Sequence, residues 1–229
     1  MAAGRLTPRW RALALVVAAL GFMVLSPFLL RRLEFFRVRR VEISGLHYLE
    51  AAKIVAALKL PRSASIFDDP EPLERRVRSV PGVVEAEVGR RAPGTLRLSL
   101  RESVPVALTP KLDRLAMVDA RGKVLPFDPL ASSPDLPVLI GGGAMVAGAL
   151  ARVRDFDPGL FARIDAAWRV GPDVVFEVDG RWYWFGPQLT AEDIEAVTAV
   201  EQALARQGRK FQELDGRFTG QVIVRWSRA

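Results

Sequence analysis

An uncharged, apolar run near the start of the chain constrains the fold more than any other feature. Residues 12–30 form a stretch of 19 residues without a charged side chain. As an α-helix this stretch would be about 28 Å long, close to the hydrocarbon thickness of a bilayer. A cleaved signal peptide is the alternative, but its apolar core is usually about 7 to 15 residues long and ends at a small-x-small site. The run here ends in Phe28-Leu29-Leu30-Arg31-Arg32, so an uncleaved transmembrane helix over 12–30 is predicted.

The charges on either side of this run do not fix its orientation. Three arginines precede the run and five follow it between residues 31 and 40, and this count alone favours an extracytoplasmic N-terminus. Long domains translocate largely regardless of charge, however, and residues 1–11 are too few to form a domain. We therefore expect a cytoplasmic tail over 1–11, held at the anionic leaflet by Arg5, Arg9 and Arg11, and an extracytoplasmic domain region after the span.

The net charge of +7 is concentrated at the N-terminus. The chain has 33 Lys+Arg and 26 Asp+Glu, and residues 1–40 hold eight of the basic residues and one of the acidic ones. The rest of the chain therefore has 25 basic and 25 acidic residues, and its net charge is zero. Nucleic-acid binders carry a basic patch on their folded part, and this balance therefore argues against one. The chain has no Cys and one His, which excludes a disulfide framework, a thiolate nucleophile and a two-His metal site. No cofactor or metal is predicted.

Residues 31–108 show the periodicities of a small α+β domain. An extended stretch with Val41 and Ile43 is closed by Ser44-Gly45, and a helix over 51–58 follows, because its apolar residues recur at helical spacing. A second helix is predicted after Asp69, which is expected to cap its first amides, with Pro70 at the first helical position.

A β-hairpin is predicted over 84–101. Apolar and polar residues alternate on both sides of the turn at 92–94, so one face of the hairpin is expected to be dry. On the wet face, Glu85 and Glu87 are expected to oppose Arg97 and Arg101. An exposed strand gives these carboxylates no apolar pocket, and a solvated charged face is therefore predicted in place of an acid/base dyad.

Several segments of this region resemble the POTRA domain of the bacterial cell division proteins FtsQ and DivIB. The resemblance covers residues 35–108 and keeps the order, spacing and turn chemistry of that family together. It implies a β-α-α-β-β fold. POTRA modules also occur in outer-membrane assembly proteins, but the helical anchor and the helical segments that follow argue against that class. The matching segments are 35–45, 60–61, 80–88, 92–96 and 101–107.

Residues 109–229 are predicted to form a β-rich domain of mixed or antiparallel sheet with packed helices. Gly141-Gly142-Gly143 is predicted to be a turn, because no phosphate-binding pattern follows it. In 181–185, alternation puts Trp182 and Trp184 on one face, so at least one aromatic pair is expected in the core, with a ligand contact as the alternative. The expected elements are a hairpin over 115–125, a helix near 145–154, strands over 164–170, 174–178 and 181–185, a capped helix from 190 to 208, and strands over 211–214 and 221–226.

The C-terminal segment 215–226 again resembles FtsQ, in which a tyrosine and a tryptophan occur at the positions of Phe218 and Trp226. In that family the last strand is a sheet edge that receives a strand of the partner FtsB. Such an edge presents unpaired amides and carbonyls, and this one shows no proline or protective bulge. Phe218 lacks the tyrosine hydroxyl. The resemblance implies a partner-binding edge, and ordinary core or edge packing is the alternative. The residues of this edge are Arg217, Phe218, Gln221, Val222, Val224 and Trp226.

The whole pattern resembles a non-catalytic, single-pass scaffold of the bacterial divisome. The resemblance implies an inner-membrane protein of the division septum whose POTRA domain recruits early division proteins and whose C-terminal edge binds FtsB-like and FtsL-like partners, with no small-molecule substrate. One alternative is a POTRA-containing transport or secretion accessory. Another is a carboxylate-dependent cell-wall hydrolase, since members of a carboxylate pair can lie far apart in sequence. His47, in an expected turn, does not complete a Ser-His-Asp set.

Overall fold

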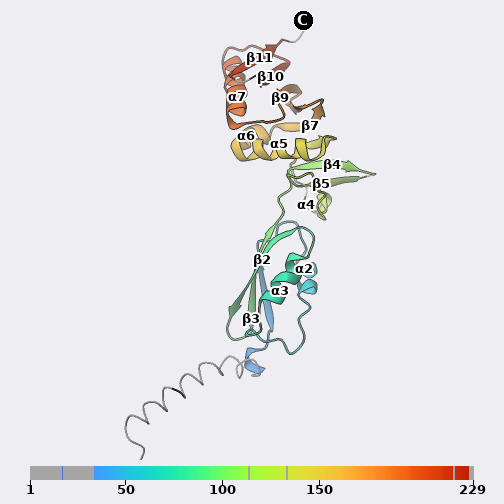
Figure 1. The fold of residues 1–229 in the computed structure, drawn as a ribbon, viewed down its shortest axis with the longest axis vertical. Helices are drawn as coiled ribbons and strands as arrows, with labels where there is room; N and C mark the ends of the chain where they lie inside the picture. Colours follow the sequence, from blue (N-terminus) through green and yellow to red (C-terminus); the bar gives the residue numbers. More distant parts are fainter. Residues whose placement is uncertain (1–16, 18–33, 113, 133, 219, 227–229) are drawn as a thin grey trace, which may run out of the picture. The chain divides into compact units, whose positions relative to one another are not determined.

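The computed structural model describes residues 17, 34–112, 114–132, 134–218 and 220–226, which fall into two compact units divided between Glu102 and Ser103 (Figure 1). The predicted tail over 1–11 and all of the predicted membrane helix over 12–30 except Val17 lie outside these ranges. Among the described residues, no helix combines the length and the apolar character needed to cross a membrane.

The first unit has the predicted order of one strand, two helices and two strands. Its three-stranded sheet has the order β1-β3-β2, with β1 parallel and β2 antiparallel to β3. Apolar residues of both helices, among them Ile54 and Val77, share a core with alternate residues of β3, such as Leu98. The elements are the 3₁₀ turn η1 (Glu34–Phe36), β1 (Arg40–Ser44), α2 (Ala51–Leu58), α3 (Glu71–Arg78), β2 (Val83–Arg91) and β3 (Thr95–Glu102).

Two local predictions for this unit need correction. Pro70 is the N-cap of α3 and not its first helical residue, while the Asp69 carboxylate accepts a hydrogen bond from the Glu71 amide at 3.1 Å. The helix therefore begins one residue later than predicted.

On the wet face of the hairpin, Glu85 pairs with Arg101 as expected. The expected opposition of Glu87 and Arg97 is wrong. Glu87 lies opposite Ser99, and Arg97 forms its ion pair with Glu42 of β1 at 3.4 Å. The difference arises because β1 joins the sheet beside β3 and brings a carboxylate that lies far away in sequence. The face is nevertheless a solvated array of paired charges, as predicted.

The second unit is built on an eight-stranded mixed sheet with the order β11-β10-β9-β8-β7-β6-β4-β5. Side chains of α5 and α7, among them Leu150 and Ile194, share one core with Phe176, Tyr183 and Phe185 of the sheet. The elements are β4 (Ala107–Lys111), β5 (Arg114–Val118), α4 (Pro129–Ser132), β6 (Val138–Ile140), α5 (Gly143–Phe156), α6 (Pro158–Phe161), β7 (Ile164–Val170), β8 (Asp173–Val178), β9 (Arg181–Phe185), α7 (Ala191–Arg206), β10 (Glu213–Phe218) and β11 (Gln221–Arg225).

Local sequence signals explain the elements next to the C-terminal edge. Thr190 and Asp193 form a reciprocal capping box that starts α7, with the Thr190 amide donating to the Asp193 carboxylate at 2.9 Å. Asp179 and Gly180 both adopt positive φ in the two-residue turn between β8 and β9, which matches the hairpin signal.

The expected hairpin over 115–125 is confirmed only in part. β5 pairs with β4, and residues beyond the turn at 119–122 return to it only through the isolated bridge between Val118 and Val124. The predicted boundary after residue 108 consequently falls inside β4, a strand of the second sheet. The strand predicted over 211–214 is displaced to 213–218, because Asp215 pairs with Ile223 of β11 and Trp184 of β9, so the strand continues through a sequence typical of a turn.

The aromatic run of β9 divides between the two faces of the sheet. Tyr183 and Phe185 are fully buried on the helix-covered face. Trp184 is half-buried and Trp182 is 40% exposed on the other face, where the Trp182 ring stands edge-on to Trp168. The predicted alternation is therefore correct, and one pair of the run belongs to the core.

Candidate partner-binding edge

β11 is a terminal strand of the second sheet. It pairs antiparallel with β10, so that Glu213 faces Arg225 and Leu214 faces Val224. In the part of the chain that the structure describes, no strand pairs with its other side. The strand therefore has one satisfied edge and one edge available to an incoming chain.

The register identifies which backbone groups face outward. The amide of Trp182 donates to the carbonyl of Gln212 at 3.0 Å, so Leu214 directs its backbone groups toward β9, while Glu213 and Asp215 direct theirs toward β11. Their partners Arg225 and Ile223 accordingly face β10. Because backbone groups alternate along a strand, the N–H and C=O of Val222 and Val224 point away from the sheet.

The side chains of β11 alternate between the core and the solvent. Val222 and Val224 pack against the core of the second unit, whereas Gln221, Ile223 and Arg225 are exposed on the other face. The pairing of β10 with β11 shifts by one residue between Asp215 and Phe218. The extra residue lies in β10, however, so the outer side of β11 stays extended.

A buried carboxylate fixes the hairpin beside this edge. Asp215 is 1% exposed, and Arg217 binds it in a bidentate manner, with Nε to Oδ1 at 2.8 Å and Nη2 to Oδ2 at 2.6 Å. The same guanidinium binds Asp173 of β8 at 2.8 Å and lies 5.0 Å from the centre of the Trp184 ring. The hydrogen bonds from Arg217 hold the pKa of the Asp215 carboxyl below its usual range. Arg217 therefore joins three strands and is not a free cation.

Aromatic side chains flank both ends of β11. Phe218 precedes it and is 49% exposed, and Trp226 follows it and is 44% exposed. The guanidinium of Arg209 lies 4.1 Å from the centre of the Trp226 ring. This cation–π contact holds the indole beside the loop between α7 and β10. Exposed aromatic rings at the ends of an unpaired strand are suited to contact with another protein.

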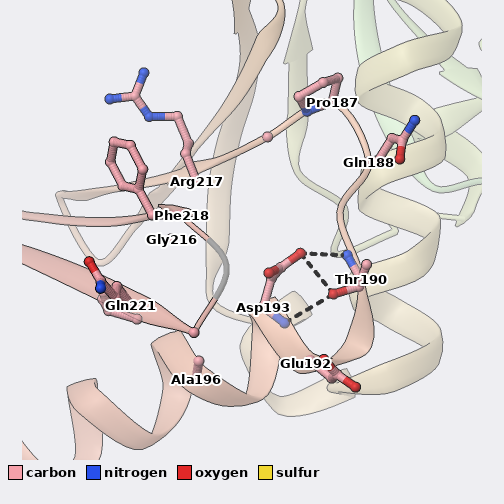
Figure 2. Close-up of a pocket in the computed structure, with 13 residues that line it drawn as sticks. Pro187, Gln188, Thr190, Glu192, Asp193, Ala196, Gly216, Arg217, Phe218 and Gln221 are labelled. Atoms are coloured by element: carbon pink, nitrogen blue, oxygen red, sulfur yellow. Dashed lines mark hydrogen bonds between the residues drawn. The ribbon is translucent and has the colours of Figure 1, made fainter.

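A pocket of about 420 Å³ opens beside the β10–β11 turn, between that turn and the start of α7. Figure 2 shows Arg217 and Phe218 on one side of it and the hydrogen-bonded Thr190 and Asp193 on the other. Its lining mixes polar side chains, backbone and one aromatic ring. The other lining residues are Gly186, Pro187, Gln188, Glu192, Ala196, Gly216, Gly220, Gln221 and Val222.

The structure brings four of the six predicted edge residues to this pocket: Arg217, Phe218, Gln221 and Val222. Val224 and Trp226 lie toward the other end of β11. The sequence interpretation missed Asp173 and Asp215, although the alternation of Asp215 and Arg217 along one strand face was a usable signal. Among the described residues, no group of three or more His, Asp or Glu side chains is arranged to hold a metal ion.

The first unit and most of the chain are similar to known proteins. A family model described as a POTRA domain of the FtsQ type matches residues 36–103. Cell division protein FtsQ of Rhodothermus marinus is 31% identical over 242 residues, which cover 95% of this chain and 88% of that protein. FtsQ of Zymomonas mobilis is 33% identical over 139 residues, covering 59% of this chain and 44% of that protein.

The extracytoplasmic domain of DivIB from Geobacillus stearothermophilus, solved as its trans isomer, matches 46% of this chain and 96% of that domain, with 18% identity and a TM-score of 0.34. The sequence comparisons define the first unit as similar to the POTRA domains of division proteins. The chain belongs to the FtsQ family of bacterial cell division proteins.

Proposed function

We propose that the chain is a non-catalytic, single-pass scaffold of the divisome at the inner membrane of the division septum. Residues 12–30 anchor it, residues 1–11 form a cytoplasmic tail, and both described units are extracytoplasmic. The uncharged run and the membership in a cell division family support this proposal. The POTRA domain recruits earlier division proteins, and the second unit binds FtsB-like and FtsL-like proteins through β11.

The observation that carries the partner proposal is the outward edge of β11. An incoming strand of the FtsB-like protein pairs with the N–H and C=O groups of Val222 and Val224, and so extends the eight-stranded sheet. The ordered Asp215–Arg217 pair and the core packing of both valines hold the edge rigid before the partner arrives, which lowers the entropy lost on binding.

Side chains around the edge supply selectivity in this proposal. Gln221, Ile223 and Arg225 contact one face of the incoming strand, while Trp226 and Phe218 cover its ends. The pocket beside Phe218 accepts a side chain that continues beyond the strand. Main-chain hydrogen bonds then provide affinity, and these side chains determine which sequence is accepted.

The experiment measures binding of the full-length chain in detergent micelles to the purified extracytoplasmic parts of FtsB-like and FtsL-like proteins from the same organism. The decisive variant is Val224→Pro, which removes an outward amide without removing a hydrogen bond to β10. The control is Val170→Thr, at an exposed residue of β7 outside the proposed interface, which keeps every backbone donor. We expect Val224→Pro to abolish binding and Val170→Thr to retain it.

Folding must be checked by thermal melting of each variant. Binding that survives Val224→Pro in a folded protein would falsify strand addition at β11. No binding by the folded unaltered chain would remove the FtsB-like and FtsL-like partners from the proposal and leave the family assignment intact.

A further inference from the structure

The first unit carries a concentration of positive charge at one end that the proposed function does not use. We infer that this end, which we call the anchor-proximal pole, binds the headgroups of anionic phospholipids on the extracytoplasmic surface of the membrane. The pole consists of exposed side chains on two segments of the unit, residues 35–40 and 90–91: Phe35, Arg37, Arg39, Arg40, Arg90 and Arg91.

Backbone contacts bring these segments together. The amides of Arg39 and Arg40 donate to the Gly94 carbonyl at 2.8 and 3.2 Å, so the chain entering β1 lies on the turn between β2 and β3. Arg40 and Arg91 are both registered opposite Thr95, on either side of β3. A Cβ at Gly94 would lie 2.5 Å from the Arg37 carbonyl oxygen, which shows how closely the two segments approach.

Most of this charge is not neutralised within the unit. Arg37 pairs with Glu34 at 3.0 Å, and Arg91 pairs with Glu42 at 3.3 Å. Among the described residues, Arg39, Arg40 and Arg90 form no ion pair: Arg39 donates to the Glu34 carbonyl and Arg90 to the Asp68 carbonyl. The Asp68 carboxylate accepts the Ser65 amide. Three guanidinium groups therefore remain available to an external anion.

An exposed aromatic ring accompanies the arginines. Phe35 is 59% exposed, yet its ring is fixed edge-on to Phe36 with 5.1 Å between ring centres. Phe36 in turn lies edge-on to Phe67 at 5.0 Å. An exposed apolar ring among arginines is a combination found in segments that lie at a membrane interface, because the ring enters the headgroup boundary while the cations contact phosphates.

The position of the pole along the chain favours a lipid surface over an acidic protein. Figure 1 shows η1 at the end of the unit where β1 begins. Glu34 follows the apolar run by four residues, which span at most about 14 Å when extended. If residues 12–30 are the anchor, as proposed above, the pole is held within reach of the headgroups, where its local concentration with respect to lipid is high.

The first test uses residues 34–229, which contain every residue of both hydrophobic cores. This fragment lacks the proposed anchor, so its sedimentation with vesicles reports only its own surface. We expect it to sediment with vesicles of phosphatidylcholine and phosphatidylglycerol in equal parts, to remain in solution with phosphatidylcholine alone, and to be released by added salt.

The decisive comparison is between two triple variants with equal loss of charge. Replacing Arg39, Arg40 and Arg90 by Gln is expected to weaken partitioning about tenfold or more, and Phe35→Ser to weaken it severalfold. Arg78, Arg121 and Arg206 are exposed and form no ion pair with another described residue, and replacing these three by Gln is expected to have little effect. The inference is overturned if both triple variants lose partitioning equally. It is also overturned if the folded fragment does not bind the mixed vesicles, and the pole then binds a protein partner or no partner.

The full-length chain provides a second measurement. Because the chain has no cysteine, Ala92→Cys beside Arg91 can carry a single polarity-sensitive fluorophore. In reconstituted vesicles we expect a blue shift that requires phosphatidylglycerol and disappears when Arg39, Arg40 and Arg90 are replaced. That variant should bind partners at β11 normally, so failure of the lipid inference is distinguishable from failure of the proposed function.

Discussion

The carboxylate of Glu102, at the end of β3, accepts a hydrogen bond from the backbone amide of Tyr48 at 2.8 Å. The same group accepts the amides of His47 and Leu49 at 3.0 and 2.9 Å. One buried carboxylate thus holds the segment between β1 and α2 against the end of the central strand β3. Three amide donors on one carboxylate make this a charge-assisted site that has no equivalent elsewhere among the described residues of the first unit.

Glu102→Gln should lower the free energy of unfolding of the first unit by about 2 kcal/mol, because a neutral amide presents one acceptor oxygen in place of two charged ones. Urea denaturation of the fragment 34–229 measures this. Glu87→Gln, on the exposed face of β2, is the control and should leave the transition unchanged. Equal stability of the two variants would show that the three amides are satisfied without the charge.

Gly45→Ala tests the turn that closes β1. Gly45 has φ of +82°, and a Cβ there would lie 1.9 Å from the Leu100 carbonyl oxygen. Both the backbone strain and the collision with backbone predict a loss of about 3 kcal/mol or more. Gly89→Ala in β2 of the same unit is the control, because the nearest atom to its Cβ is 3.7 Å away. Thermal melting of the two variants should therefore separate clearly.

Asp215→Asn should make the free energy of unfolding of the second unit less dependent on pH in the acidic range. The folded-state pKa of Asp215 is depressed, so its stabilising effect is present above the ordinary aspartate pKa near 4 and is lost as the pH falls through the lower folded value. At neutral pH the variant should be less stable by about 2 kcal/mol, and the difference should shrink in acid. Chemical denaturation across this pH range measures it.

The control for that prediction is Asp165→Asn, an exposed residue of β7. Its difference from the unaltered protein should be small at every pH. A difference at Asp215 that stays constant down to strong acid would contradict the assignment of the effect to the ionised carboxylate.

Trp226→Ala should weaken binding of the FtsB-like partner about tenfold or more, since Trp is among the residues that most often dominate interface energies once a partner covers them. Its ring packs on Arg209 at the surface, so stability should change little. Trp182→Ala removes a ring of similar exposure from the sheet face and serves as the control. Isothermal titration with the partner's extracytoplasmic part distinguishes them, and equal losses would remove Trp226 from the proposed interface.

Much of the fold follows from short-range signals in the sequence. The capping box at Thr190 and Asp193, the Asp179-Gly180 turn and the alternation in 181–185 each depend on residues a few positions apart, and each was predicted correctly. The order of elements in the POTRA domain was predictable for the same reason. Periodicity and turn chemistry act locally, so they can be recognised without knowing what lies across the sheet.

The sequence by itself determined the apolar run, the element order of the POTRA domain and the presence of a C-terminal strand. Only the tertiary structure decided which strands pair. It placed Arg217 on Asp173, 44 residues away, and Glu102 on the amide of Tyr48, 54 residues away, and it joined the arginines of the anchor-proximal pole. Such contacts depend on strand register and on core packing, which are properties of the whole sheet and leave no periodic signal in the local sequence.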